Sequence, residues 1–330
     1  MSLKQYPKAR RAPQRGLTLV ELLVAVAVNL IVVLVAAYLY LNGRNTQQAV
    51  EERSALFENG QLALELIGKE VGNAGYYPAH MREPDASLQV TLGRYVNPQP
   101  VVAAFNAGVF GCASGRFDAG ACVNADDTEY KGDGLVLNYF TDDALTLSAG
   151  ARGDCQGNKV DNDPINDATR AGSAKDNPKK VPDHPLFVSN RYTLKKYTYR
   201  TPSGKKILTF GLACQGNGSA RPSYQPLVPG IEQLRVRYGL RDAGAARATQ
   251  YVNATDAGAA GAVVVSDATL QGWERVVSVQ VCVVARSLSE TRFQGAGAES
   301  RVDCDGNTLA NDGVQRRRFM QVFAVKNRLS

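Results

Sequence analysis

The stretch RGLTLVELLVAVAVNLIVVLVAAYLYLNG, residues 15–43, decides the fold of the chain, because nearly every residue from Leu17 to Leu41 is apolar. A helix of about 20 apolar residues is long enough to cross a bilayer, and residues 17–41 exceed that length. The main polar interruptions are Thr18, Glu21 and Asn29. We therefore predict a membrane-length helix at the front of the chain, with an unexplained carboxylate near its beginning.

The carboxylate of Glu21 has two competing explanations. An acidic side chain costs about 2.5–3.5 kcal/mol at the centre of a membrane-spanning helix and less near its end. In the first explanation, an acid in the first turn interacts favourably with the positive end of the helix dipole. In the second, the carboxylate neutralises a positive group that would otherwise be buried without a counter-charge.

The charge of the chain is concentrated in front of this stretch. The formal net charge is +7, and residues 1–16 contain no acid but five basic residues, namely Lys4, Lys8, Arg10, Arg11 and Arg15. A basic flank stays on the cytoplasmic side of a membrane, so the bulk of the chain should lie outside. The remainder is close to neutral, so nucleic-acid binding by a globally basic surface has weak support. A secretory signal, the rival interpretation, usually has a shorter apolar region followed by its cleavage site.

The order basic leader, Gly16, Leu17-Thr18-Leu19-Val20-Glu21 and long apolar run resembles the class III signal of type IV prepilins and pseudopilins. The resemblance implies that a prepilin peptidase cuts between Gly16 and Leu17 and that Leu17 is then N-methylated. It also implies that Glu21 docks the subunit by neutralising the new N-terminal ammonium of a neighbouring subunit. Many pilins have a proline where this chain has Tyr38, so Gly43 is the nearest substitute helix breaker.

The helical pattern continues beyond the apolar stretch. Apolar or small residues recur at helical spacing from Arg44 to Val71 and include Leu56, Gly60, Ala63 and Ile67, with Leu62, Leu64 and Leu66 widening the face. Stop signals follow at Gly72, Gly75 and Pro78. We therefore expect one helix of roughly 50 residues that starts in a membrane and ends packed on a globular domain.

After residue 78 the sequence favours β-structure. Strands are expected at 134–140, 191–200, 206–213, 231–240, 273–285 and 316–326. Residues 150–185 and 241–261 lack periodicity and are expected to form surface loops. The segments IGKEVGNAGYYP (67–78), PLVPGIEQLRVRYG, WERVVSVQV and RRRFMQVFAVKNR resemble PilW-like minor pilins. The expected fold class is α+β, a type IV pilin-like fold with a long N-terminal helix packed on an antiparallel sheet.

All six cysteines follow the apolar stretch: Cys112, Cys122, Cys155, Cys214, Cys282 and Cys304. None forms a CxxC pair, and His80 and His184 are the only histidines, so a zinc site is disfavoured. Disulfides in an oxidising compartment fit better, with buried free thiols as the alternative. Sequence order suggests the pairs 112–122, 155–214 and 282–304, but six cysteines allow about 15 connectivities.

Other candidate sites are weak. Residues 303–307, Asp-Cys-Asp-Gly-Asn, begin like a calcium loop but lack its later glycine and glutamate, so a polar loop is favoured. Arg152-Gly153-Asp154 matches an adhesion tripeptide, although turn chemistry explains it better, and Arg316-Arg317-Arg318 is expected to be solvated. The sequence singles out no catalytic pair, metal site or cofactor motif, so we predict that the chain is not an enzyme.

We therefore expect a cleaved leader at 1–16, a transmembrane and filament-core helix at 17–41, its amphipathic continuation at 42–78, and a periplasmic domain at 79–330. The resemblance implies a minor pilin that is anchored in the inner membrane and later incorporated at or near the tip of a type IV pilus. Implied partners are the prepilin peptidase, the major pilin, other minor pilins and a PilY-type tip adhesin. Alternatives are a J-type pseudopilin of type II secretion, a tip adhesin or DNA-binding module, and a plain membrane protein with one span.

Overall fold

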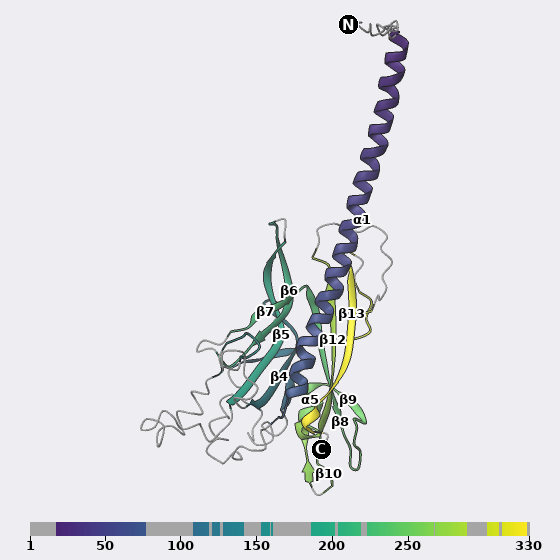
Figure 1. Cartoon of the computed structure of the whole chain (residues 1–330). Helices are drawn as coiled ribbons and strands as arrows, with labels where there is room; N and C mark the ends of the chain where they lie inside the picture. Colours follow the sequence, from purple (N-terminus) through teal and green to yellow (C-terminus); the bar gives the residue numbers. More distant parts are fainter. Residues whose placement is uncertain are drawn as a thin grey trace, which may run out of the picture. The chain divides into compact units, whose positions relative to one another are not determined.

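The computed structural model of the chain (Figure 1) describes residues 18–76, 108–118, 121–125, 128–141, 153–158, 160, 186–201, 204–218, 223–266, 268–288, 302–309 and 312–328. The chain forms two units, Met1–Glu51 and Glu52–Ser330. One long helix, α1 (Leu19–Asn73), begins in the first unit and ends in the second. The α+β class predicted from the sequence is confirmed, because the other large elements among the described residues of the second unit are antiparallel strands.

Helix α1 is 55 residues long and buries the face that its sequence pattern predicts. The residues of that face at 56, 60, 63, 64, 67 and 71 are all buried in the second unit. The prediction for Leu62 is wrong, because its side chain is 39% exposed. At about 100° per residue, Leu62 points roughly 140° away from the centre of the stripe formed by the other positions, so it faces the solvent.

The two predicted helix breakers behave differently. Helix α1 runs through Gly43 without interruption, so this glycine does not break the single long helix that the sequence predicts. A lone glycine weakens a helix by only about 1 kcal/mol, which intact neighbouring turns tolerate. Gly75, by contrast, has a left-handed φ of 74°, and its N–H donates to Asn138 O at 2.9 Å. Only glycine takes that conformation without strain, so the chain leaves the helix there.

The first sheet has the strand order β1-β4-β5-β6-β7, all antiparallel. Its strands are β1 (Val109–Cys112), β4 (Tyr130–Thr141), β5 (Leu186–Arg200), β6 (Lys206–Gln215) and β7 (Gln225–Pro229). The strands predicted at 134–140, 191–200 and 206–213 exist, and each is longer than expected. Hydrogen bonds to neighbouring strands extend each strand beyond the apolar residues from which the sequence predicts it.

The second sheet has the order β13-β12-β8-β9. Its strands are β8 (Ile231–Leu240), β9 (Gln250–Val252), β12 (Val276–Arg286) and β13 (Arg316–Ala324). Strand β8 matches its predicted bounds, but the prediction that a strand starts at Trp273 is wrong. Residues Gly272–Arg275 form a 3₁₀ turn, η2, in which Glu274 and Gln271 make a reciprocal capping pair. Local capping thus outweighs the strand propensity of the tryptophan.

Gly230 joins the two sheets between β7 and β8. Its φ is +70°, its N–H donates to Phe210 O in β6, and its carbonyl accepts from Arg286 N–H in β12. A Cβ added at this position would lie 2.9 Å from Arg286 O. The close approach and the positive φ both require glycine, so this residue allows the chain to pass directly from one sheet to the other.

Residues 241–261 are more structured than a surface loop, which corrects the expectation for this segment. They contain β9 and a short helix, α5 (Ala254–Gly258), which Asn253 caps by accepting from Asp256 N–H at 2.9 Å. Ala254 and Ala257 are buried in the core beside Trp273. Small alanines pack closely without producing the periodicity of large apolar residues, so the sequence pattern does not reveal them.

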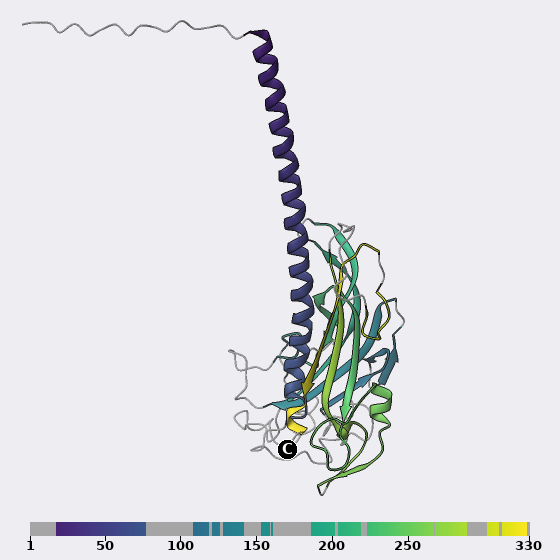
Figure 2. The ribbon, with the colours of Figure 1, turned by 90° about the vertical axis from the view of Figure 1, so that its right-hand side faces the viewer.

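Two hairpins complete the described structure: β2 (Gly115–Asp118) with β3 (Ala121–Asn124), and β10 (Val263–Val265) with β11 (Ala268–Leu270). A single apolar cluster joins the buried face of α1 to both sheets. Within it, Tyr238 packs edge-on to Trp273 with ring centroids 4.8 Å apart. Figure 2 shows the strands of the second unit lying along the lower half of α1.

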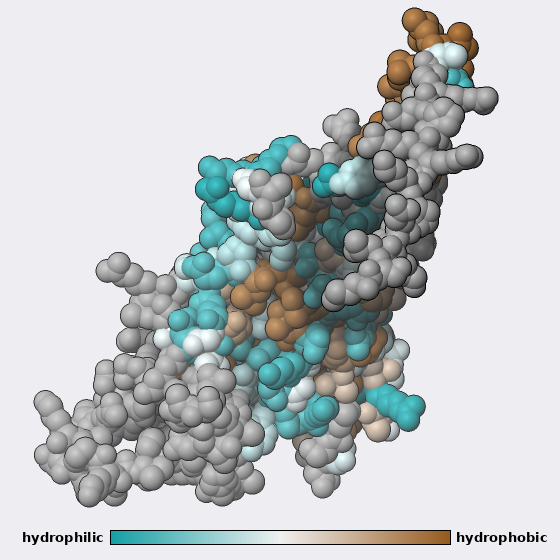
Figure 3. Space-filling model, turned by 45° about the horizontal axis from the view of Figure 1, so that its top comes forward, coloured by the Kyte–Doolittle hydropathy of each residue, from teal (hydrophilic) through white to brown (hydrophobic). Residues whose placement is uncertain are grey.

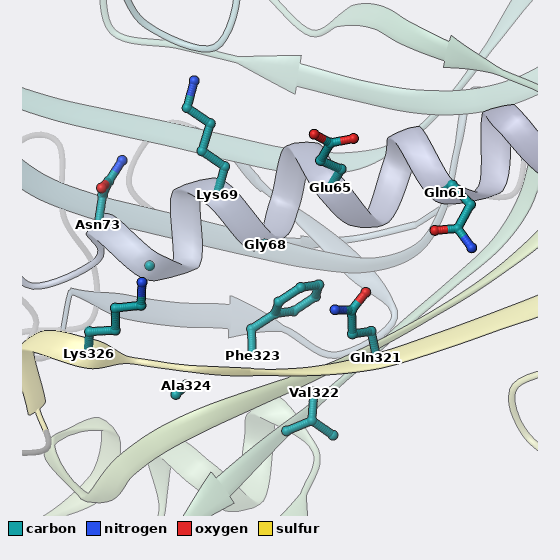
Figure 4. A pocket seen from close by; sticks show the side chains of 11 residues that line it. Gln61, Glu65, Gly68, Lys69, Asn73, Gln321, Val322, Phe323, Ala324 and Lys326 are labelled. Carbon is teal, nitrogen blue, oxygen red and sulfur yellow. The ribbon is translucent and has the colours of Figure 1, made fainter.

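Two glycines of α1 leave space into which aromatic rings of the last strand, β13, pack. A Cβ at Gly60 would lie 2.3 Å from the ring of Phe319, and one at Gly68 would lie 2.2 Å from the ring of Phe323. In Figure 4 the Phe323 ring points from β13 toward α1 at Gly68. Phe57 adds an edge-on contact to Phe319 at 5.5 Å. The absence of side chains at these two helix positions therefore sets how closely β13 packs on the helix.

Because of this packing, we expect glycine-to-alanine substitutions at two positions of α1 to change the stability in opposite directions. Gly60→Ala should lower the free energy of unfolding by about 1–3 kcal/mol, because the new methyl group overpacks the buried Phe319. Gly72→Ala should raise it by up to about 1 kcal/mol through helix propensity, since nothing lies within 4 Å of a Cβ there. Urea unfolding of the full chain in detergent, followed by the fluorescence of Trp273, measures both. Equal effects of the two substitutions would contradict the packing role of Gly60.

Candidate functional site

Thr18 and Glu21 form a capping box at the start of α1. The Thr18 N–H and hydroxyl both donate to Glu21 Oε2, at 2.9 and 3.0 Å, and Glu21 N–H donates back to Thr18 Oγ1 at 3.3 Å. This reciprocal pattern satisfies groups that a helix N-terminus otherwise leaves unpaired. The helix-start explanation of Glu21 therefore has a specific geometry, which the sequence motif Thr-x-x-Glu already contains.

The capping box leaves Glu21 able to bind a second group. Both donations from Thr18 go to Oε2, and the side chain is exposed at the helix end. The remaining oxygen, Oε1, can accept from an ammonium while the box stays intact. The helix-start and docking explanations are thus compatible. Gly16 and Leu17, the predicted cleavage and methylation positions, lie outside the described residues.

The N-terminal half of α1 exposes an apolar surface on all sides. Leu19–Arg44 is the helical segment long and apolar enough to cross a membrane, and none of it is buried within the described chain. Its large apolar side chains are between 50% and 76% exposed from Leu19 to Leu41. Figure 3 shows this hydrophobic surface along part of the helix. Such a helix needs lipid or other helices around it, because water disfavours contiguous apolar surface of this size.

Three disulfides join Cys112 to Cys122, Cys155 to Cys214, and Cys282 to Cys304. These are the pairs that sequence order suggested, and the alternative of free thiols is wrong. The second disulfide attaches the segment 153–158 to β6. The other two close a short loop that contains β2 and attach the loop around residue 304 to β12.

Asp154, part of the adhesion-like tripeptide, is committed to internal hydrogen bonds. Its carboxylate is buried and accepts from the backbone N–H groups of Gln156, Asn158 and Gly218, each at 2.9 Å. A carboxylate occupied in this way organises the turn beside Cys155. The geometry therefore agrees with the turn-chemistry interpretation of this motif.

The loop around residues 302–309 is held by hydrogen bonds and an ion pair. Asp303 Oδ1 accepts from the N–H groups of Asp305 and Asn307, and the Asp305 carboxylate pairs with Arg235 at 2.9 Å. Burial raises the pKa of Asp303, but the hydrogen bonds from Asn307 and Asp305 outweigh it and lower the pKa overall. Among the described residues no group of three or more His, Cys, Asp or Glu side chains is arranged to hold a metal.

Two structural anchors were missed in the sequence. Asp133 is buried and accepts from Ser114 N–H and Val236 N–H at 2.9 Å, and it pairs with Arg235 at 3.3 Å. Asn190 donates to Glu70 of α1 at 2.8 Å and accepts from Cys155 N–H. The Gly-Asp-Gly run at 132–134 was a possible signal for the first, because it marks an irregularity in β4. Nothing in the local sequence marks the second.

A groove separates α1 from the free edge of β13. Gln61, Glu65, Lys69 and Asn73 line it from the helix, and Gln321, Phe323 and Lys326 line it from the last strand and its end (Figure 4). The lining mixes both signs of charge with amides and leaves no buried carboxylate or nucleophile aimed into the groove. This arrangement suits contact with another polypeptide better than chemistry on a small molecule.

Two models of known protein families match the chain. The family model Type IV Pilus-assembly protein W matches residues 196–327, which include β6, β8, β12 and β13. The Prokaryotic N-terminal methylation motif matches residues 11–37, which contain Gly16, Leu17 and Glu21. The chain is PilW-like in its C-terminal part and carries the methylation motif at its N-terminus. Among the described residues, the two matches fall on the apolar part of α1 and on strands of both sheets.

Among solved structures, this PilW-like pilin matches a type IV-like pilin from Thermus thermophilus. The two are 12% identical, the match covers 83% of this chain and 98% of the other, and the TM-score is 0.35. No curated protein matches the sequence. The statement of family therefore depends on the two family models together with the helix and sheet described above.

Proposed function

We propose that this PilW-like protein is a minor pilin that primes assembly of a type IV pilus and is incorporated at or near its tip. The observation that carries the proposal is the helix α1 itself. One half exposes a mostly apolar surface and begins with a capped carboxylate, and the other half is built into a disulfide-bonded domain. Such a helix can first anchor a domain in a membrane and then pack among the helices of a filament.

Processing follows from the N-terminal motif. The leader 1–16 is removed by a prepilin peptidase between Gly16 and Leu17, and Leu17 is methylated. Residues 17–41 hold the subunit in the inner membrane with its N-terminus cytoplasmic, 42–78 continue the helix, and 79–330 form the periplasmic domain. The three disulfides support that placement, because such bonds persist in oxidising compartments.

The partners we propose are those a pilus subunit needs. Other minor pilins and the major pilin cover the apolar half of α1, and Glu21 docks each subunit against the N-terminal ammonium of a neighbour. A PilY-type adhesin is the proposed partner at the tip. The role that we propose is structural, in keeping with a family described by pilus assembly. The description of the matching family, pilus assembly, favours a pilus over a type II secretion pseudopilus.

The mature N-terminus gives the first test of this proposal. Mass spectrometry of the protein purified from its own membranes should find a chain that begins with N-methylated Leu17. Sheared pili should contain the same form at low abundance. An intact Met1 would exclude a processed pilin. A processed chain found in secretion pseudopili and absent from pili would assign it to type II secretion.

A further inference from the structure

Positive charge is concentrated on the hairpin formed by β5 and β6. The sequence contains no Asp or Glu from Leu186 to Ile231. The same range contains seven basic residues: Arg191, Lys195, Lys196, Arg200, Lys205, Lys206 and Arg221. Most of them lie in the part of the hairpin that extends toward its turn. The chain as a whole is close to neutral beyond its leader, so this is a local surface.

The strand register places three of these cations on one face. Lys196 lies opposite Phe210, and Arg200 lies opposite Lys206. Directly opposite residues of an antiparallel pair point to the same side, and so do residues two apart along one strand. Lys196, Arg200 and Lys206 therefore share a face with Phe210 and Leu208. The contact between the Lys196 ammonium and the Phe210 ring, 5.8 Å from its centroid, agrees with this assignment.

Folding alone does not explain this face. Like charges directly opposite one another destabilise a strand pair, yet Arg200 and Lys206 are opposed and both exposed. None of the ion pairs among the described residues includes Lys196, Arg200 or Lys206. Leu208, between them on the same face, is 62% exposed. The hairpin thus presents cations that form no ion pair with a described residue, around an exposed apolar side chain.

That combination fits the surface of an anionic bilayer. Lipid phosphates attract the cations, and the apolar side chain enters the boundary between headgroups and acyl chains. Single-stranded nucleic acid would instead need open aromatic faces for its bases. The ring on this face, Phe210, already has the ammonium groups of Lys131 and Lys196 near it, each 5.8 Å from the centroid.

The chain also contains a candidate membrane span shortly before the start of the second unit. The candidate span ends at Arg44, and the second unit begins at Glu52, so the connecting helix adds only about 10 Å. Within the second unit, Asn190 near the start of β5 contacts Glu70 near the end of α1. From that contact, strands β5 and β6 run along α1 within the second unit (Figures 1 and 2). A short tether keeps the local concentration of bilayer surface high.

We propose that the face formed by Lys196, Arg200, Lys206 and Leu208 binds anionic lipid headgroups while the subunit is held in the membrane. The contact holds the domain against the bilayer until the subunit is extracted. This proposal rests on the membrane-anchored state in the proposed function. N-terminal mass spectrometry tests that function separately, so failure of one is distinguishable from failure of the other.

The test uses the full chain in nanodiscs of phosphatidylcholine alone or with phosphatidylglycerol. Hydrogen exchange of the peptide amides at 196–210 should slow only in the anionic discs. Each cation near such a surface contributes about five-fold in binding, so Arg200→Gln with Lys206→Gln should weaken the contact roughly 30-fold and remove most of the protection. Raising the salt concentration should have the same effect, because the attraction is screened.

The matched control is Arg237→Gln with Arg247→Gln, which removes the same charge from exposed positions on β8 and in the segment that follows it. That variant should keep the protection of the hairpin. Equal exchange in neutral and anionic discs would overturn the proposal, as would equal loss in both double variants. Protection by added single-stranded DNA in neutral discs, without any effect of anionic lipid, would overturn it as well and assign the face to nucleic acid.

Discussion

Replacing Glu21 with alanine should leave cleavage of the leader largely intact but lower incorporation into filaments by about two orders of magnitude. Removing one partner of a buried ion pair costs about 3–5 kcal/mol, because the other charge stays buried without compensation. Here the remaining charge is the proposed N-terminal ammonium of a neighbouring subunit. Immunodetection in sheared pili, normalised to the membrane pool, measures the effect.

Thr18→Val provides the control, because it removes the capping hydroxyl and keeps the carboxylate. Loss of a cap weakens a helix by about 1 kcal/mol, so incorporation should fall only about five-fold. The two variants thus distinguish the capping explanation of Glu21 from the docking explanation. Equal losses for the two variants would show that Glu21 acts only as a helix cap. Normal incorporation of Glu21→Ala would refute the docking role.

The second large effect is expected from the disulfide between Cys155 and Cys214. This bond spans a sequence separation of 59 residues, the longest of the three. Closing a loop of that length removes about 4 kcal/mol of entropy from the unfolded chain in the loop-entropy model. Substitution of both cysteines with serine should therefore lower the free energy of unfolding by an amount of that order. Urea unfolding of the full chain in detergent measures it.

The matched variant substitutes Cys112 and Cys122, whose separation is 10 residues. The same model gives about 2.7 kcal/mol for a loop of that length, so this variant should be clearly less destabilised. A reversed order would mean that strain or packing at each site, rather than loop length, sets the contribution. No loss in either variant would show that the bonds are not formed in the protein.

The sequence predicts the large elements of the fold because their residues repeat over many turns or ladder positions. Helix α1 and strand β8 have strong periodicity, so both were placed well. The segment 250–258 was missed because its buried residues are alanines, which carry little hydropathy signal. Trp273 was misplaced because capping between Gln271 and Glu274, three residues apart, outweighs the strand propensity of a short segment.

Within the candidate site, too, interactions between residues close in sequence could be predicted and those between distant residues could not. Thr18 and Glu21 are three residues apart, so their capping geometry could be predicted from the local sequence. Asp133 and Asn190 act through partners more than 100 residues away in the chain, at Val236 and Glu70, and no local pattern encodes such pairs. The unpaired charge of the β5–β6 hairpin also needed the strand register, because only the register shows that Arg200 and Lys206 share a face.

The fit of Phe319 and Phe323 against Gly60 and Gly68 has a consequence for biosynthesis. The ribosome makes the helix first and β13 almost last, so the buried half of α1 has no complete partner until translation is nearly finished. In the export that we propose, that half would therefore wait with its apolar stripe uncovered, where periplasmic chaperones could bind it. A nonsense codon before Phe319 would consequently leave an anchored subunit whose domain cannot close, and proteases would be expected to remove it.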